Sequence, residues 1–309
     1  MDIDSLQQQF GSDTVKFVKG PGEFVSIEIA NAIAKAKICT YGAHIMEFTP
    51  AGQLPLLWMS KSSWFEAGKP IRGGVPLCWP WFGAGASPEL PAHGFARLSQ
   101  WQVAGVEALE CGATHVTLTL SGRDVTNQAL VKFPFELQME FTVGSRLQLT
   151  LTMRNLSDQP QVVTDALHTY FSVSDTEKIA IRGLDLVGYE DRVVGAPVVY
   201  GNVQAGDIKI SAEVDRIYLD TMSAVEIVDP GFKRTIRIEK EGSASTVVWN
   251  PWVRKSHAMP DFGDDEFHGM VCIEAVNASI DARTIEPGGT HVLAQKITNL
   301  SRASLFIRG

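Results

Sequence analysis

Two ionisable side chains lie in otherwise apolar stretches of this sequence. His168 occurs in D-A-L-H-T-Y-F, and Glu274 occurs in V-C-I-E-A-V. A carboxylate in such a stretch is costly to bury unless it is paired or faces a wet cavity. An imidazole and a carboxyl group can act as general acid and base, so we predict that His168 and Glu274 belong to one catalytic site. The alternatives stay open that His168 is a hydrogen-bonded core residue and that Glu274 has no catalytic role.

Further polar groups occur in a loop region that runs from Ile71 to Arg97. It reads I-R-G-G-V-P-L-C-W-P-W-F-G and then, after a short spacer, P-A-H-G-F-A-R. Gly and Pro interrupt every periodic run, so the backbone must turn repeatedly. The guanidinium groups of Arg72 and Arg97 suit hydroxyls or the oxygens of a phosphate, and His93 adds a titratable ring. The aromatic residues of this region include Trp79 and Trp81. We predict that the region forms a wall of a small-molecule site, with its aromatic faces against a sugar; the alternative is that they are core residues.

Two acidic features are weaker candidates. Asp215, in V-D-R-I-Y-L, could bind a ligand or form a surface ion pair. With Glu274 it could also supply the two carboxylates of a glycoside hydrolase, which stays open. The segment Asp261–His268, D-F-G-D-D-E-F-H, lacks the ligand spacing of an EF-hand and the paired histidines of zinc enzymes. We interpret it as a solvated acidic loop.

The composition is that of a globular protein without disorder. The 309 residues are 45% hydrophobic and 20% charged, with a net charge of −8, which argues against nucleic acid or an anionic membrane as a partner. Four scattered cysteines without a C-x-x-C pair predict free buried thiols in a reducing compartment. The amino terminus is acidic and polar, and no apolar run is long enough to span a membrane, so we expect a cytoplasmic protein.

These side chains must be positioned by strands, because period-two alternation of apolar and polar residues recurs along the chain. The clearest hairpin is F-E-L-Q-M-E-F-T-V and R-L-Q-L-T-L-T-M-R-N, joined at Gly144 and Ser145. We find at least ten strand candidates and no amphipathic helix of three turns; residues 1–20 are a short helix or an arm. The pattern predicts an all-β fold, a large antiparallel β-sandwich. Without a linker or composition break, we expect one domain over residues 1–309.

At this point the sequence resembles a known family. R-G-G-V-P-L-C-W-P-W-F-G, P-A-H-G-F-A-R, A-L-H-T-Y-F, D-R-I-Y, W-N-P-W and D-D-E-F-H-G-M-V-C-I-E-A are similar to motifs of the hexose-6-phosphate mutarotases, or glucose-6-phosphate 1-epimerases, of the aldose 1-epimerase superfamily. The likeness runs in order from about Ala43 to the final strand. It implies a galactose-mutarotase-like β supersandwich with a site on the concave face of its larger sheet.

The resemblance also implies roles for individual residues. His168 matches the general acid of the family and Glu274 its general base. Residues that bind the sugar are matched by Arg72, His93 and Asp215, and Arg97 is expected to bind phosphate beside Arg72. It gives no role to Trp252 in W-N-P-W. The list of six candidate site residues is therefore Arg72, His93, Arg97, His168, Asp215 and Glu274.

The implied activity is interconversion of the α and β anomers of a hexose 6-phosphate, with glucose 6-phosphate the expected substrate. The resemblance implies no metal and no organic cofactor, and a small-molecule sugar phosphate as the only partner; a monomer is compatible with it, but the sequence does not determine the oligomeric state. A non-catalytic carbohydrate-binding protein on the same fold and a mutarotase of free aldoses stay open as alternatives.

Overall fold

The computed structural model describes residues 2–195 and 201–300, and this part of the chain is built almost entirely of antiparallel sheets. The predicted all-β class is confirmed. Within the described residues there are two α-helices, α1 (Ile3–Phe10) and α2 (Trp252–His257), so the short N-terminal helix expected in residues 1–20 is also present. Single turns of 3₁₀ helix occur at Pro21–Glu23, Ala96–Leu98, Gly122–Asp124, Gln128–Leu130, Glu266–Gly269 and Ser279–Asp281.

One layer is an eight-stranded sheet. In spatial order its strands are β13 (Ala180–Arg182), β16 (Val225–Asp229), β17 (Arg234–Glu241), β21 (Thr290–Leu300), β9 (Leu147–Asn155), β8 (Phe135–Val143), β7 (Thr114–Ser121) and β6 (Gln102–Ala108). The hairpin predicted around Gly144 is β8–β9, whose register starts at Val143 opposite Leu147. Alternate residues along β8 are buried, as the period-two pattern requires for a sheet with one solvated face.

A seven-stranded sheet carries the chemistry-bearing strands. Its order is β14 (Tyr189–Asp191), β15 (Val214–Tyr218), β18 (Ser245–Asn250), β19 (Met270–Asn277), β11 (Asp165–Leu167) and β5 (Leu77–Cys78), with β12 (Tyr170–Ser172) also paired to β19. Every residue of β19 is buried, so both faces of this sheet are covered at its centre. That explains why the sequence around Glu274 is apolar on both sides of the strand.

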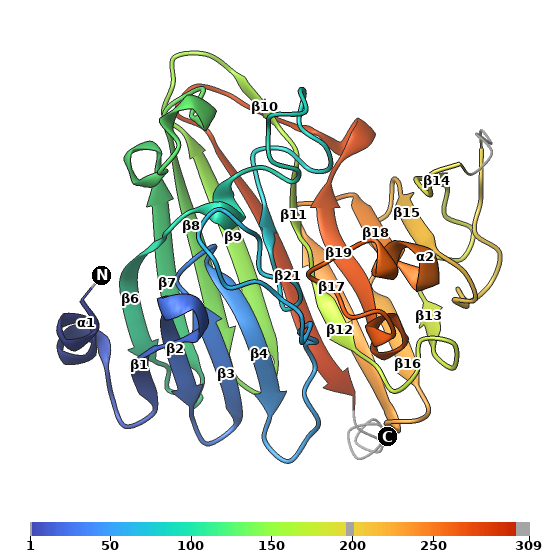
Figure 1. Ribbon diagram of the computed structural model, residues 1–309, viewed down its shortest axis with the longest axis horizontal. Coiled ribbons are helices and arrows are strands. Elements are labelled where there is room, and N and C mark those ends of the chain that lie inside the picture. The colour runs from blue at the N-terminus through green and yellow to red at the C-terminus, as the bar shows by residue number, and fades with distance from the viewer. Residues whose placement is uncertain (1, 196–200, 301–309) are drawn as a thin grey trace.

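Two smaller sheets complete the fold. One contains β1 (Val15–Lys19), β2 (Val25–Ala30), β3 (Ala34–Cys39) and β4 (His44–Pro50), and the other pairs β10 (Gln161–Val163) with β20 (Arg283–Ile285). A bridge between Ile45 and Val75 joins the four-stranded sheet to the β5 side of the seven-stranded sheet. In Figure 1 the strands β1–β4 lie in front of β6–β9, and α2 lies beside β15 and β18. The joined sheets form the larger of the two layers.

The main core lies between these layers and includes aromatic residues that we expected at the site. Trp79 is fully buried; its ring packs 4.4 Å from Phe135 and 5.4 Å from Phe95, and its indole N–H points to the sulfur of Met153 at 3.1 Å. Trp81 packs against this core and donates a hydrogen bond to the carbonyl of Pro91. The prediction that the aromatic residues of this region line a sugar site is therefore wrong for Trp79, whose side chain is enclosed by the sandwich core, and stays a prediction for Trp81, which is only half-buried.

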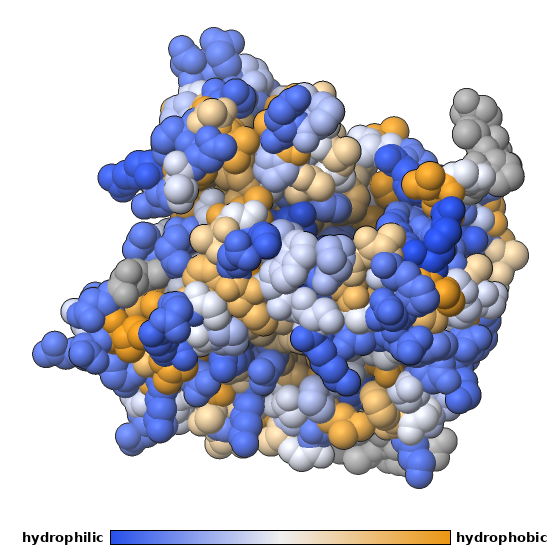
Figure 2. Space-filling model, viewed as in Figure 1, coloured by the Kyte–Doolittle hydropathy of each residue, from blue (hydrophilic) through white to orange (hydrophobic). Residues whose placement is uncertain are grey.

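The surface in Figure 2 is mostly hydrophilic, with hydrophobic residues in small separate groups. None of the described helices has the length and apolar character that crossing a membrane would demand. All four cysteines are free, as predicted; Cys39, Cys78 and Cys272 are buried, whereas Cys111 is exposed.

Candidate active site

The site residues project from the face of the seven-stranded sheet that points away from the eight-stranded sheet, here called the outer face. Along β19, Val271, Ile273 and Ala275 pack into the main core, so Cys272 and Glu274 point the opposite way. The outer face has its own apolar cluster, which includes Tyr170, Trp249, Phe262 and Phe267. It is therefore a second, smaller core in which polar groups are embedded.

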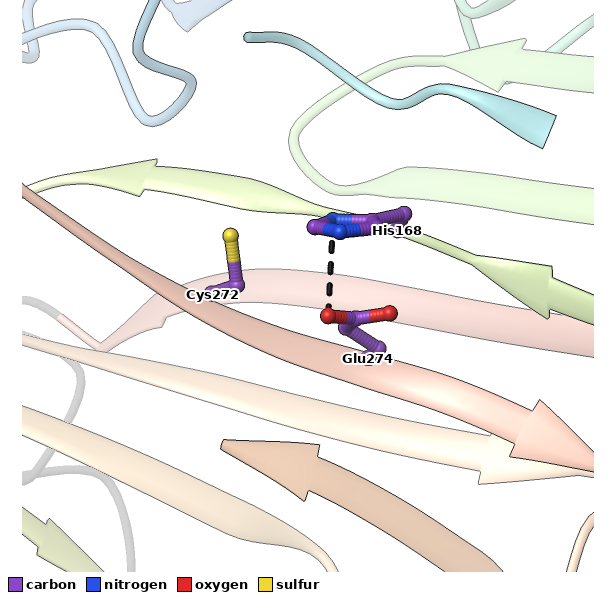
Figure 3. Close-up of side chains that lie close together, drawn as sticks. All are labelled: His168, Cys272 and Glu274. Carbon is purple, nitrogen blue, oxygen red and sulfur yellow. Dashed lines mark ion pairs between the residues drawn. The ribbon is translucent and has the colours of Figure 1, made fainter. Parts of the chain in front are cut away.

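Strand register brings His168 and Glu274 together. Leu167 pairs with Ala275 and Tyr170 pairs with Cys272, so His168, between β11 and β12, lies directly opposite Glu274. The Nδ1 atom of His168 is 3.4 Å from Oε1 of Glu274. Figure 3 shows the two groups facing each other, with the thiol of Cys272 beside them. The sequence prediction that these two residues share a site matches this geometry.

Both side chains of this pair are buried, and each has a polar atom that makes no hydrogen bond within the described part of the chain. The His168 side chain is 9% exposed and that of Glu274 is 1% exposed. Nδ1 of His168 and Oε2 of Glu274 have no hydrogen-bond partner among the described residues. Buried polar atoms are nearly always hydrogen-bonded, so two free ones at one point indicate a position reserved for a ligand or a reaction.

Burial shifts the two pKa values toward the neutral forms. It raises the pKa of Glu274 well above 4.5, with the nearby charge of Asp215 acting in the same direction. It lowers the pKa of His168 well below 6.5, and the charges of His93, Arg72 and Arg97 lower it further. A neighbouring carboxylate ordinarily raises the pKa of a histidine, but here burial has the larger effect. Between the lowered pKa of His168 and the raised pKa of Glu274, the pair therefore holds one titratable proton, which burial places on the carboxyl of Glu274.

A chain of contacts orients the imidazole. The ring of Tyr170 stacks on that of His168 with centroids 4.9 Å apart and planes 9° from parallel. Arg72 donates from Nη1 to the Tyr170 hydroxyl at 3.0 Å, and from Nε and Nη2 to Asp261 at 3.1 and 2.9 Å. Because a planar guanidinium fork fixes its partners in direction as well as distance, Arg72 holds Tyr170 and hence the face of His168.

The acidic segment Asp261–His268 is only in part the solvated loop that we expected, because Asp264, Asp265 and His268 are exposed but its other residues are not. Asp261 is 3% exposed and forms the ion pair with Arg72, and Phe262 beside it packs on Trp58. Glu266 accepts hydrogen bonds from the hydroxyl of Ser60 and two backbone N–H groups. The segment covers the outer face, since its acidic groups satisfy donors there and its phenylalanines complete the apolar cluster.

His93 approaches His168 from the loop side. Their ring centroids are 5.7 Å apart in an edge-to-face arrangement, and Phe82 contacts His93 from another direction at 5.0 Å. The residue has a φ of 60°, and its Nδ1 accepts the N–H of Gly83 at 3.2 Å. Burial lowers the pKa of His93 well below 6.5, so its neutral ring carries the proton on Nε2 and can donate it to a ligand oxygen.

Asp215 lies on β15, two strands from Glu274 on the same face. Its register partner is Trp249, and its carboxylate accepts from Nζ of Lys255 at 3.2 Å, not from the adjacent Arg216. Lys255 also lies 5.7 Å from the centre of the Trp249 ring. Burial raises the pKa of Asp215 above its usual 3.8. Asp215 and Lys255 thus place a paired negative and positive group beside an aromatic face.

Arg97 is more deeply buried than its predicted role as a phosphate ligand suggested. It is 8% exposed; Nη2 donates to the carbonyl of Ala92 at 2.8 Å, and Nε has no acceptor. Its charge nevertheless favours the ionised form of Glu274, so the guanidinium lies within electrostatic reach of the pair. The structure thus brings all six candidate residues to the same region of the outer face.

Exposure increases outward from the pair. The exposed fraction of the side chain rises from 1% for Glu274 and 9% for His168 to 18% for Arg72, 25% for Asp215 and 33% for Lys255. A buried proton donor and acceptor are therefore bordered by charged and aromatic groups that water can reach. The buried pair can exchange protons with one end of a bound polar molecule, and the charged groups at the border can hold the other end of that molecule.

Sequence reasoning missed three contributors. Tyr170 has the same parity as His168, so the period-two rule could have assigned it to the same face. Asp261 precedes a phenylalanine in the acidic segment, which was a weak signal for burial. Lys255 belongs to α2, and no pattern in the sequence connects it to the strand that carries Asp215.

Comparisons with known proteins agree with this geometry. The family model described as "Aldose 1-epimerase" matches residues 25–298. A protein of Escherichia coli (strain K12) named "Putative glucose-6-phosphate 1-epimerase" is 34% identical over 264 residues, covering 85% of this chain and 86% of that protein. One of the same name from Cenchrus ciliaris is 32% identical over 292 residues, covering 91% and 86%.

The fold has a similar solved counterpart. The crystal structure of a protein from Salmonella typhimurium, described as "a putative mutarotase", superposes with a TM-score of 0.85 at 29% identity, covering 94% of this chain and 95% of the other. The predicted mutarotase-like sandwich is thereby confirmed. Because the family model spans nearly the whole chain and relatives above 30% identity cover most of it, this chain belongs to the aldose 1-epimerase family.

Proposed function

We propose that the protein is an isomerase that interconverts the α and β anomers of a hexose 6-phosphate, with glucose 6-phosphate as the substrate. The observation that carries the proposal is the buried contact between His168 and Glu274, in which Nδ1 of His168 and Oε2 of Glu274 have no hydrogen-bond partner among the described residues. The names of the relatives from E. coli and Cenchrus ciliaris support the same substrate. A binding protein would have no need to keep two unsatisfied titratable groups in contact.

Anomer exchange needs two proton transfers. The ring opens when the hydroxyl on C1 loses its proton to a base while the ring oxygen receives one from an acid, and the C1–O5 bond breaks to leave an aldehyde. Rotation about C1–C2 presents the other face of the aldehyde, and closure reverses both transfers. The number of protons held by the enzyme is the same before and after one turnover.

The 3.4 Å contact between His168 and Glu274 means that the two catalytic groups lie side by side and not on opposite faces of a sugar. O1 and O5 are both bonded to C1, so a donor and an acceptor lying side by side can reach both oxygens from one edge of the ring. We assign His168 as the acid and Glu274 as the base for opening, as the family resemblance implies, with the roles exchanged on closure. Because burial favours the neutral carboxyl and the neutral imidazole, this assignment requires the proton of the pair to be on His168 when ring opening begins. With one proton on the pair, one group donates and the other accepts.

The remaining site residues would hold the substrate. His93, through Nε2–H, and Asp215 would bind ring hydroxyls and keep the open aldehyde from leaving before it recloses. We propose that Arg72 and Arg97 provide the positive charge for the phosphate. Arg72 supports this role with its partly exposed guanidinium, and Arg97 with a buried Nε–H that has no acceptor.

Exchange NMR on glucose 6-phosphate, with and without protein, tests the reaction. We expect faster α/β exchange with protein, and slower exchange for free galactose or glucose at the same concentration. Replacement of Arg97 by alanine should weaken apparent affinity for the phosphate ester more than for free glucose. Equal efficiency on galactose, or an unchanged affinity in Arg97→Ala, would contradict the phosphate preference; no acceleration with any sugar would contradict the reaction itself.

A further inference from the structure

Three potential metal ligands lie close together at the proposed reaction centre. A ring nitrogen of His168, Sγ of Cys272 and a carboxylate oxygen of Glu274 all lie within 4.8 Å of one another, and all three residues are buried. Figure 3 shows the thiol standing beside the imidazole and carboxylate. We propose that His168, Cys272 and Glu274 form a binding site for Zn²⁺, and that the bound ion blocks the acid–base pair.

The donor types suit zinc. Imidazole nitrogen, thiolate sulfur and carboxylate oxygen are the three kinds of protein ligand that Zn²⁺ takes, and sites with three protein ligands keep a fourth position for water. Thiolate disfavours harder ions such as Mg²⁺ and Ca²⁺, which prefer oxygen. On binding, the thiol loses its proton to the buffer as the S–Zn bond forms. The proton held by the His168/Glu274 pair also leaves to the buffer, so that Glu274 binds as a carboxylate and two protons are released for each Zn²⁺ bound. Carboxylate and thiolate together then balance the two positive charges of the ion.

The spacing is close to that of a tetrahedral centre. With metal–ligand distances near 2 Å, a tetrahedral arrangement puts a nitrogen and an oxygen ligand about 3.3 Å apart. The observed distance from Nδ1 of His168 to Oε1 of Glu274 is 3.4 Å. These two ligands are therefore already preorganised, and Sγ of Cys272 lies within 4.8 Å of the ligand atoms of both residues.

Two of the polar atoms at this point have no hydrogen-bond partner among the described residues, although the free carboxylate oxygen is Oε2 and the one at 3.4 Å from Nδ1 is Oε1. Nδ1 of His168 and Oε2 of Glu274 are buried without a hydrogen-bond partner among the described residues. Their lone pairs would not have to leave another partner. The positive charges of Arg72 and Arg97 oppose a cation here, since both act on Cys272 or Glu274. That opposition favours a reversible inhibitory site over a permanently occupied one.

A second trio of potential ligands serves as the control. Asp175, Glu177 and His268 also lie within reach of one another, but Glu177 and His268 are exposed and the group lacks a thiol. Binding there would give no sulfur signature. Cys111 is the matched control for the thiol, because it is free, exposed and outside both trios.

The direct test uses Co²⁺ as a spectroscopic probe and Zn²⁺ in calorimetry, on chelator-treated full-length protein. We expect one equivalent of Co²⁺ to give a thiolate-to-cobalt charge-transfer band that Zn²⁺ abolishes. The band should persist in Cys111→Ser and His268→Ala and vanish in Cys272→Ser and Cys272→Ala, with Zn²⁺ affinity falling at least about tenfold. Wild-type protein without the band, or a band that survives in a folded Cys272 variant, would overturn the inference.

The inhibition rests on the proposed function and is measured separately. For each protein, the rate of glucose 6-phosphate exchange with Zn²⁺ is compared with its own rate without metal. We expect wild type and Cys111→Ser to be inhibited, with inhibition relieved by more substrate, and Cys272→Ala to be at least about tenfold less sensitive. Metal binding without anomer exchange would contradict the proposed function alone, whereas activity with no metal binding would contradict the zinc site alone.

Discussion

Replacing Glu274 by glutamine separates its proposed chemistry from its place in the core. Glutamine has nearly the same shape, and it resembles the neutral carboxyl that burial favours at this position. It can neither accept nor release the shared proton. A positioned acid or base contributes about 10²- to 10⁴-fold to rate, and at 1.36 kcal/mol per tenfold this adds about 3 to 5 kcal/mol to the barrier. We expect exchange NMR to show this loss in turnover.

The same substitution should lower turnover but raise the free energy of unfolding relative to wild type. The folded-state pKa of Glu274 is raised above the value near 4.5, so the folded protein binds more protons than the unfolded chain at higher pH. Stability from this group is therefore greatest below about pH 4.5 and is lost as the pH rises through the folded-state pKa. Glutamine does not titrate, so Glu274→Gln should gain on wild type by up to about 1.4 kcal/mol per pH unit within that window.

Chemical denaturation at several pH values, beside the rate measurement, checks both parts. Glu136→Gln is the matched control, because it makes the same change on the solvated face of β8. It should leave both rate and the pH dependence of stability unchanged. A Glu274→Gln protein that keeps its turnover would reassign the residue as structural. One that is less stable than wild type at neutral pH would show that the carboxylate is ionised and partnered in the fold.

Three further predictions concern neighbouring groups. His168→Asn should lower turnover by about 10²-fold or more in exchange NMR, because it removes the other proton carrier; a near-normal rate would contradict this. Burial lowers the pKa of His168 well below 6.5, so the rate should be lost on acidification only well below pH 6.5. A pH–rate profile whose acid limb has its midpoint at pH 6.5 would refute the shift. Asp261→Asn leaves the charge of Arg72 without its ion-pair partner, so the free energy of unfolding should drop by roughly 3 kcal/mol in urea titrations; an unchanged midpoint would show that the pair adds nothing.

The sequence predicted the fold class from period two, and it predicted a shared site for His168 and Glu274 because each is an ionisable group in an apolar stretch. Alternation places a residue on a face, and an ionisable group inside an apolar strand is a strong local signal. Burial of Trp79 could not be predicted, since Gly- and Pro-rich segments have no period that assigns a side. The pairing of Arg72 with Asp261 joins residues far apart in the chain, and local pattern carries no information on such contacts. The roles of the six site residues, and the single domain over residues 1–309, stay predictions.

The loop beside His93 has a consequence for how this family can vary. The backbone N–H of His93 donates to the carbonyl of Gly83 at 2.6 Å, and the N–H of Gly83 donates back to Nδ1 of the ring at 3.2 Å. These two bonds close the base of residues 84–92 and fix the imidazole from that base. Insertions or deletions within the tip should then be tolerated without moving the ring. Evolution could lengthen the tip to reach a larger substrate while leaving the reacting end untouched.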